Sequence, residues 1–368
     1  MRAIPSSISG CKPRRKTRRI FVGRVPVGGG APVSVQTMTK TDTRDVRATV
    51  AQIREVKQLG CDIVRLAVPD EEAARALAKI VKLAGMPVIA DIHFDHKLAM
   101  IALEGGVDGL RINPGNIGSR EKVREVVRAA RERKVPIRIG VNSGSVEKEA
   151  AEKYGAGTAD ALVASAVKHV RILEDLDYRE IKISVKASDV RRTLEAYRKL
   201  SVQTDYPLHL GVTEAGTFLA GTVRSSVALG ILIEEGIGDT IRVSLTDTPA
   251  REVRVGLELL RSLGLRRSGP AVTSCPTCGR IQVNVVEVAN RVEEALEKYY
   301  TLNPGALMPS VAVMGCMVNG PGEAKHADVA IAGGVKKFAL YVGGKLLKTV
   351  REEDAVEEVL KQVRKWRD

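Results

Sequence analysis

The chain has 368 residues, of which 44% are hydrophobic and only 3% aromatic, and its formal net charge is +14. This length exceeds one average domain, and the scarcity of aromatic side chains argues against a surface on which nucleic-acid bases stack. No apolar stretch approaches the roughly 20 residues of a membrane span and no hydrophobic signal region follows Met1, so we expect a cytoplasmic protein without membrane or nucleic-acid partners.

The N-terminal segment is strongly basic. It contains the run "KPRRKTRR" from Lys12 to Arg19. Such a charge run is typical of a solvated or disordered arm, although it can also contact an acidic partner. We therefore assign residues 1–20 to a basic arm that precedes the first domain.

Eight short apolar segments, separated by stretches of helical periodicity, follow this arm. The expected strands are 33–38, 63–68, 88–93, 109–113, 137–142, 181–186, 208–212 and 240–245. The clearest helices between and after them are 43–60, 119–134, 187–203 and 248–264. Alternating strands and helices build parallel βαβ units, and eight units favour a closed TIM-type (βα)8 barrel over an open doubly wound sheet. We predict this barrel over residues 21–266.

The alternation within these strands predicts an unusual barrel interior. Because successive side chains face opposite sides of a strand, one face of each strand points toward the helices and the other into the lumen. The polar residues predicted on the lumen side are Arg65, Asp91, His93, Arg111, Asn113, Arg138, Asn142, Lys182, Lys186, Arg242 and Ser244. Burying so many cations against essentially one lumen acid, Asp91, would cost several kcal/mol for each. Either an anionic ligand balances them, with a substrate carrying more than one phosphate as the natural counterpart, or some of them lie at the mouth of the barrel. Alternatively, individual cations form ion pairs with carboxylates of neighbouring loops.

The segment "GVTEAG" adds two polar residues, Thr213 and Glu214, after the seventh strand. Active sites of such barrels lie at the C-terminal ends of the strands, which is where these residues fall. A carboxylate among cations can transfer a proton to or from a substrate. Alternatively, Glu214 only forms an ion pair with Arg242.

The βα pattern stops near residue 267, and the remaining residues, 267–368, form a second predicted domain with a smaller α+β fold. It contains Cys275 and Cys278 in "TSCPTCGR" and Cys316 in "GCMVNGPGE", which ends at Glu323. Five cysteines, an odd count with three clustered, indicate reduced thiols or metal ligands rather than disulfides. The set is consistent with an iron-sulfur cluster, a zinc site or a redox dithiol, and either His326 or Glu323 is available as a fourth ligand.

Motifs along nearly the whole chain resemble one family. "QTMTKTDTRD", "DIHFDHKLA", "LRINPGNIG", "SVKASD", "HLGVTEAG", "GIGDTIRVSL", "SCPTCGR" and "GCMVNGPGEAKHAD" are similar to motifs of the bacterial 4-hydroxy-3-methylbut-2-enyl diphosphate synthases of the non-mevalonate isoprenoid pathway. The resemblance implies a TIM barrel followed by a domain that binds a [4Fe-4S] cluster through Cys275, Cys278, Cys316 and Glu323.

The resemblance also implies a reaction and its partners. The substrate would be 2-C-methyl-D-erythritol 2,4-cyclodiphosphate, bound through Arg111, Asn113, Arg138, Asn142, Lys186, Thr213, Arg242 and Ser244. Its ring would be opened and a hydroxyl removed by two electrons from reduced flavodoxin or ferredoxin. Glu214 would act as proton donor, and Glu323 would leave its iron when substrate arrives. A homodimer is implied as well. The alternatives are a zinc-containing barrel enzyme acting on a phosphorylated metabolite and a basic nucleic-acid-binding protein.

Overall fold

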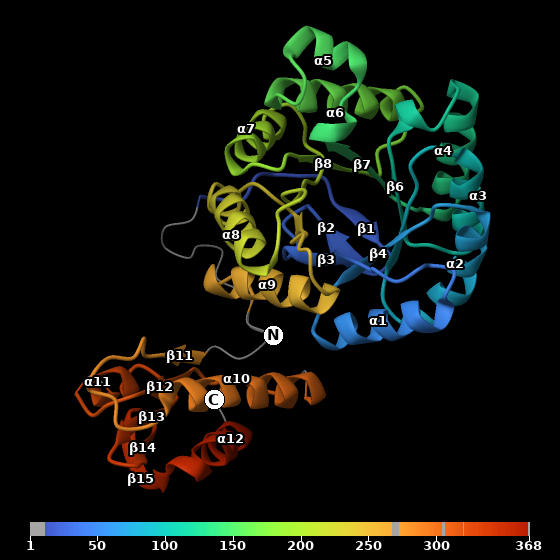
Figure 1. Cartoon of the computed structure of the whole chain (residues 1–368). Coiled ribbons are helices and arrows are strands. Elements are labelled where there is room, and N and C mark those ends of the chain that lie inside the picture. The colour runs from blue at the N-terminus through green and yellow to red at the C-terminus, as the bar shows by residue number, and fades with distance from the viewer. Residues whose placement is uncertain (1–11, 267–271, 304–305, 319, 367–368) are drawn as a thin grey trace. The chain divides into compact units, whose positions relative to one another are not determined.

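A computed structural model describes residues 12–266, 272–303, 306–318 and 320–366 (Figure 1). The chain divides between residues 266 and 267 into two compact units. Within the described ranges, no helix combines the length and the apolar character needed to cross a membrane.

The first unit is built on an eight-stranded parallel sheet that closes into a barrel. The sheet order is β8-β7-β6-β5-β4-β3-β10-β9, and a parallel bridge between Ile183 and Leu208 joins the two end strands. The strands are β3 (Ser34–Met38), β4 (Ile63–Ala67), β5 (Val88–Asp91), β6 (Gly109–Ile112), β7 (Ile137–Asn142), β8 (Ile181–Lys186), β9 (His209–Leu210) and β10 (Thr240–Ile241). The predicted barrel is therefore confirmed. Its last two strands are shorter than expected, because the chain leaves the sheet early and continues in loops.

Helices surround this barrel on the outside (Figure 1). They are α1 (Val46–Gln58), α2 (Glu71–Ala84), α3 (His96–Glu104), α4 (Arg120–Arg133), α5 (Lys148–Tyr154), α6 (Ala159–Glu174), α7 (Val190–Ser201), α8 (Phe218–Glu234) and α9 (Pro249–Ser262). Asp45, Asp70 and Asp189 precede α1, α2 and α7, and each side chain accepts a hydrogen bond from a backbone N–H of the first turn. The outward-facing Val, Ile and Leu side chains of the strands and the inner faces of the helices form one apolar core.

A hairpin that the sequence analysis missed covers the N-terminal end of the barrel. Its strands are β1 (Ile20–Val22) and β2 (Val25–Val27), which pair antiparallel. Ile20, Val22 and Val27 pack against Ile63 and Ile89, which lie at or near the starts of β4 and β5. The hairpin thus fills this end of the lumen with apolar side chains.

Residues 12–19 differ from the expected solvated arm, because they bind the outside of the barrel. The Arg15 guanidinium donates to the carbonyls of Ser201 and Tyr206, at 3.1 and 2.6 Å. Arg14 forms an ion pair with the buried Asp239 at 3.2 Å. The arginines of this run are therefore used to tie the segment to loop carbonyls and a carboxylate. Residues 1–11 of the predicted arm lie outside the described residues.

The second unit is a five-stranded mixed sheet with helices. Its sheet order is β11-β12-β13-β14-β15, parallel across the first three strands and antiparallel across the last three. The elements are β11 (Val272–Ser274), α10 (Val285–Leu302), β12 (Val311–Met314), α11 (Gly320–Ala324), β13 (Val329–Gly334), β14 (Lys337–Val342), β15 (Lys345–Arg351) and α12 (Ala355–Lys365). Apolar residues of α10 and α12 pack with one side of the sheet, and Ala324 of α11 packs with small residues of the other side.

Candidate active site

The lumen of the barrel is lined by charged side chains, as the strand alternation predicts. Ile137, Ile139 and Val141 of β7 belong to the outer apolar core, whereas Arg138 lies between them in sequence and is buried on the other side. The register places Asp91, Arg111, Arg138 and Lys182 side by side on β5, β6, β7 and β8. A band of charge therefore crosses half of the barrel interior.

Asp91 is the acidic centre of this band. Its carboxylate lies 3.2 Å from Nη1 of Arg111 and 3.4 Å from Nε of Arg65, and both arginines are largely buried. Burial alone would raise the pKa of Asp91, but the neighbouring guanidinium groups lower it to about 2. The imidazole of His93, which is half exposed, lies 2.6 Å from Arg111 Nη1 and 3.5 Å from Asp91. Burial, with Arg111 adding to it, lowers the pKa of His93.

Other groups in the lumen have no such partner. Among the described residues, Nζ of Lys182, Nε and Nη1 of Arg138 and both ring nitrogens of His209 are buried without a hydrogen bond. Burial, followed by the charges of Arg138 and Arg65, lowers the pKa of Lys182 to about 7. Burial, followed by repulsion from the charges of Arg138 and Arg242, lowers the pKa of Lys186 well below its ordinary value. This excess of positive charge is suited to an anionic ligand.

Two glycines leave room for the cationic side chains. A Cβ atom at Gly140 would lie 2.7 Å from Nε of Arg111, and one at Gly211 would lie 2.5 Å from Nζ of Lys186. The backbone carbonyl of Gly140 also accepts a hydrogen bond from Arg111 Nη2 at 2.8 Å. Side chains at these two positions would displace both cations from the lumen.

Further predicted residues lie at or just beyond the C-terminal ends of the strands. Asn113 is buried, and its Oδ1 accepts a hydrogen bond from the Gly140 N–H at 3.0 Å. Asn142 and Thr213 are partly exposed. Glu214 is exposed, and its φ of 51° lies in the left-handed region that non-glycine residues rarely adopt. In the described part of the chain its carboxylate has no hydrogen-bond or ion-pair partner, so the expected alternative of a pair with Arg242 is not found.

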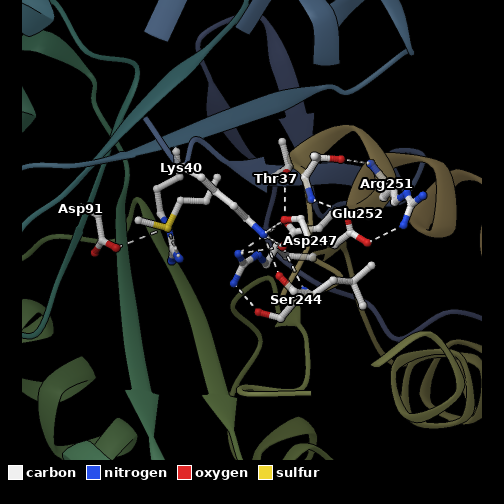
Figure 2. Close-up of polar contacts among 12 residues, drawn as sticks. Thr37, Lys40, Asp91, Ser244, Asp247, Arg251 and Glu252 are labelled. Carbon is white, nitrogen blue, oxygen red and sulfur yellow. Dashed lines mark hydrogen bonds and ion pairs between the residues drawn. The ribbon is translucent and has the colours of Figure 1, made fainter. Parts of the chain in front are cut away.

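The acidic partner of Arg242 is instead Glu252 of α9. Figure 2 labels Glu252 together with Lys40 and Ser244. Nη1 of Arg242 donates to Oγ of Ser244, and Nη2 lies 3.4 Å from both oxygens of Glu252. Lys40 also pairs with Glu252, at 3.1 Å. Strand alternation does not indicate Glu252 or Lys40, because Glu252 lies on a helix and Lys40 lies in the loop after β3. The signal available in the sequence was an acidic residue in the first turn of the helix that begins at the proline of "SLTDTP".

The cysteines lie in the second unit, at the C-terminal edge of neighbouring parallel strands. Cys275 directly follows β11 and Cys316 follows β12 by two residues. The Gly315 N–H donates to Sγ of Cys275 at 3.2 Å. Cys278 is exposed, and Glu323 is exposed on the short helix α11.

The three thiols and the carboxylate are the donor types of an iron-sulfur cluster, and two of the thiols share one sheet edge with an N–H directed at sulfur. Within the described ranges, however, no three His, Cys, Asp or Glu side chains converge closely enough to hold a metal ion. The described residues thus offer donor types that suit a cluster, but they are not assembled into a metal site in this structure.

Family models match both units of the chain. Residues 17–257 match the GcpE TIM-barrel domain, and residues 271–365 match the GcpE protein C-terminal domain. The chain belongs to the GcpE family. Its fold and its two-part organisation are those the matching family domains describe.

Several named relatives are similar over almost the whole chain. A protein of Geobacter sulfurreducens is 58% identical over 355 residues, covering 96% of this chain and 98% of the relative. One from Thermodesulfovibrio yellowstonii is 55% identical, covering 96% and 99%. One from Symbiobacterium thermophilum is 56% identical, covering 95% and 93%. Each of these relatives is named 4-hydroxy-3-methylbut-2-en-1-yl diphosphate synthase (flavodoxin).

Solved structures resemble the barrel only distantly. A dihydropteroate synthase from Stenotrophomonas maltophilia is 13% identical with a TM-score of 0.49, covering 67% of this chain and 98% of that one. A likeness at this level says nothing about the chemistry of the site.

Proposed function

We infer that the chain is a 4-hydroxy-3-methylbut-2-enyl diphosphate synthase, an oxidoreductase of the non-mevalonate isoprenoid pathway. Family membership over nearly the full length supports this inference. The structural observation that carries it is the surplus of buried cations in the barrel lumen, where Arg138 and Lys182 have unpartnered polar atoms among the described residues. A substrate with two phosphates supplies the missing negative charge.

The proposed substrate is 2-C-methyl-D-erythritol 2,4-cyclodiphosphate. Its phosphates would be bound by the forked donors of arginines and the point charges of lysines, while hydroxyl and amide groups orient the rest of the molecule. The residues proposed for this binding are Arg65, Asp91, His93, Arg111, Asn113, Arg138, Asn142, Lys186, Thr213, Arg242 and Ser244. Asp91 would act mainly by orienting Arg65 and Arg111, whose guanidinium groups it contacts.

Glu214 is the proposed proton donor. The reaction adds two electrons, opens the cyclic diphosphate and removes one hydroxyl, which leaves as water after it takes up a proton. Glu214 is exposed in the loop that follows β9 and carries no partner among the described residues, so its carboxyl group is available to a substrate. Non-glycine residues with a left-handed backbone are found at helix ends as well as at active sites, and Glu214 is not at a helix end, which supports a functional role.

Cys275, Cys278, Cys316 and Glu323 are the proposed ligands of a [4Fe-4S] cluster. When bound, the cluster would supply the electrons singly, together with a Lewis-acidic iron. The Gly315 N–H that donates to Sγ of Cys275 would stabilise the thiolate form of this ligand. Glu323 provides an oxygen ligand, which binds iron less firmly than a thiolate does.

The electron donor proposed for the chain is reduced flavodoxin, which the names of the relatives mention, rather than ferredoxin. The homodimer and the cytoplasmic location stay predictions from the sequence.

Turnover tests this function. The full chain, reconstituted with iron and sulfide without oxygen, should convert the cyclodiphosphate to 4-hydroxy-3-methylbut-2-enyl diphosphate with a chemical reductant. The product is identified by mass spectrometry and phosphorus NMR. A reconstituted protein that binds the cyclodiphosphate yet returns it unchanged under reduction would contradict the proposed reaction.

A further inference from the structure

Glu252 occupies an unusual position in the barrel, because it is 1% exposed. Among the described residues, its carboxylate contacts hydrogen-bond donors alone, some of which Figure 2 shows. Oε2 accepts from Oγ1 of Thr37 at 2.8 Å, and Oε1 accepts from the Leu245 N–H at 3.0 Å. The two remaining neighbours are the cations Arg242 and Lys40, at 3.4 and 3.1 Å. A buried carboxylate with four donors is fully satisfied.

The chemistry of these neighbours requires a carboxylate at this position. A carboxylate only accepts hydrogen bonds, whereas the amide of a glutamine presents an NH2 group on one side. The Leu245 N–H, Arg242 and Lys40 can only donate, and the Thr37 hydroxyl alone could turn to accept from that NH2 group, so a glutamine would still lose its favourable contacts to the two cations. The negative charge also compensates two cations in a largely buried setting, where an unpaired charge is costly.

Lys40 uses its donors on the protein itself. Its Nζ donates to the carbonyl of Leu245 at 2.7 Å and to that of Asp247, besides pairing with Glu252. Lys40 follows β3, and Leu245 and Asp247 lie in the loop between β10 and α9. Lys40 therefore ties two loops together at the C-terminal end of the barrel and neutralises part of the charge of Glu252.

Arg242 has N–H groups that no described protein group accepts. One of its terminal nitrogens donates to Ser244 and the other lies at 3.4 Å from Glu252, while Nε has no hydrogen-bond partner among the described residues. Burial lowers the pKa of Arg242, and the charge of Glu252 opposes this effect. Glu252 thus orients the guanidinium and favours its charged form. It does not use all of the N–H groups of Arg242, so some of them are available to a ligand.

We propose that Glu252 is a positioning residue of the active site, which holds Arg242 in the orientation that binds a substrate phosphate while Lys40 compensates the remaining charge of Glu252. This proposal rests on the proposed function, because it assigns Arg242 to phosphate binding. The proposal adds Glu252, a helix residue outside the strands, to the groups on which the affinity for the substrate phosphates depends.

Binding of inorganic pyrophosphate to the full chain, measured by calorimetry, tests this proposal without requiring turnover. Glu252→Gln should weaken pyrophosphate binding by about 10-fold or more, the effect of losing about one charge-assisted hydrogen bond. In the holoenzyme it should raise KM by a similar factor and change kcat less. Glu258→Gln, at an exposed position of the same helix, is the matched control and should bind like the wild type.

A double-mutant cycle with Arg242→Ala separates positioning from a merely structural role. If Glu252 acts through Arg242, Glu252→Gln should weaken pyrophosphate binding no further once Arg242 is replaced. Equal losses of affinity in both backgrounds would overturn the proposal. If Glu252→Gln does not fold, Glu252→Asp is used instead. It keeps the negative charge, but its side chain is one methylene shorter, so the carboxylate lies farther from Arg242. A folded Glu252→Asp with wild-type affinity would also overturn it.

Pyrophosphate binding and turnover of the wild type distinguish a failure of this proposal from a failure of the proposed function. A wild type that does not bind pyrophosphate contradicts both the anion site and the positioning role. A wild type that binds pyrophosphate with the expected cycle, but does not turn over the cyclodiphosphate, supports the role of Glu252 and contradicts the proposed reaction.

Discussion

Replacing Lys182 by methionine should stabilise the barrel and flatten the pH dependence of its stability. Lys182 is 1% exposed, its Nζ has no hydrogen-bond partner among the described residues, and Arg138 lies beside it in the register of β7 and β8. Methionine has a similar unbranched shape and carries no charge. The substitution therefore removes a repulsion and a desolvation cost and leaves the packing nearly unchanged.

The magnitude follows from proton linkage. The pKa of Lys182 is about 7 in the folded chain, against an ordinary value of 10.5. Between these values the unfolded chain binds a proton that the folded chain does not, so the free energy of unfolding rises with pH. The slope is at most about 1.4 kcal/mol per pH unit. This stability is fully present above pH 10.5 and is lost as the pH falls toward 7. The advantage of Lys182→Met over the wild type should thus shrink by about 2 to 3 kcal/mol from pH 7.5 to 9.5.

Urea unfolding followed by circular dichroism, at several pH values in that range, measures this difference. Lys79→Met, on the exposed face of α2, is the matched control for loss of a lysine and should follow the wild type. A constant gap between Lys182→Met and the wild type from pH 7.5 to 9.5 would refute the assignment of a buried, unpartnered amine. A less stable Lys182→Met would refute it as well.

Three further predictions concern the site. Arg242→Ala should raise KM by about 10-fold or more with a smaller change in kcat, because a phosphate contact is lost. Steady-state assays measure both constants. An unchanged KM would mean that Arg242 only forms a structural ion pair. Glu214→Gln should lower kcat by about 100-fold while pyrophosphate binding stays at the wild-type level, since the proton donor is lost; wild-type kcat would remove Glu214 from the reaction. Glu323→Ala should retain much of its iron through three thiolates yet lose most turnover, whereas Cys316→Ser should lose the iron. Iron analysis and activity of both variants check this, and full activity of Glu323→Ala would contradict its role as a ligand.

The barrel was predictable because its signals are local. Each strand from β3 to β8 is a short apolar alternation followed by a helix with an apolar face, and the parity of β7 alone separates Arg138 from Ile137 and Ile139. The hairpin β1–β2 was missed because three-residue strands carry too little periodicity, and because its role depends on distant residues such as Ile63.

The polar network of the site was only half predictable. Lumen residues such as Asp91 and Arg111 follow from strand alternation, but Glu252 reaches Arg242 from a helix, and no periodicity within a strand indicates such a contact. The basic run at residues 12–19 shows the same limit. Its charge predicted solvation, whereas carbonyl groups far along the chain, such as that of Tyr206, bind Arg15.

Metal analysis of the anaerobically purified full chain shows whether three cysteines and Glu323 bind a redox cluster. We expect a brown protein with a broad visible absorbance, about four irons per chain and a paramagnetic signal on reduction. A colourless protein with one zinc per chain and no iron after anaerobic reconstitution would contradict this expectation and favour a zinc-containing barrel enzyme.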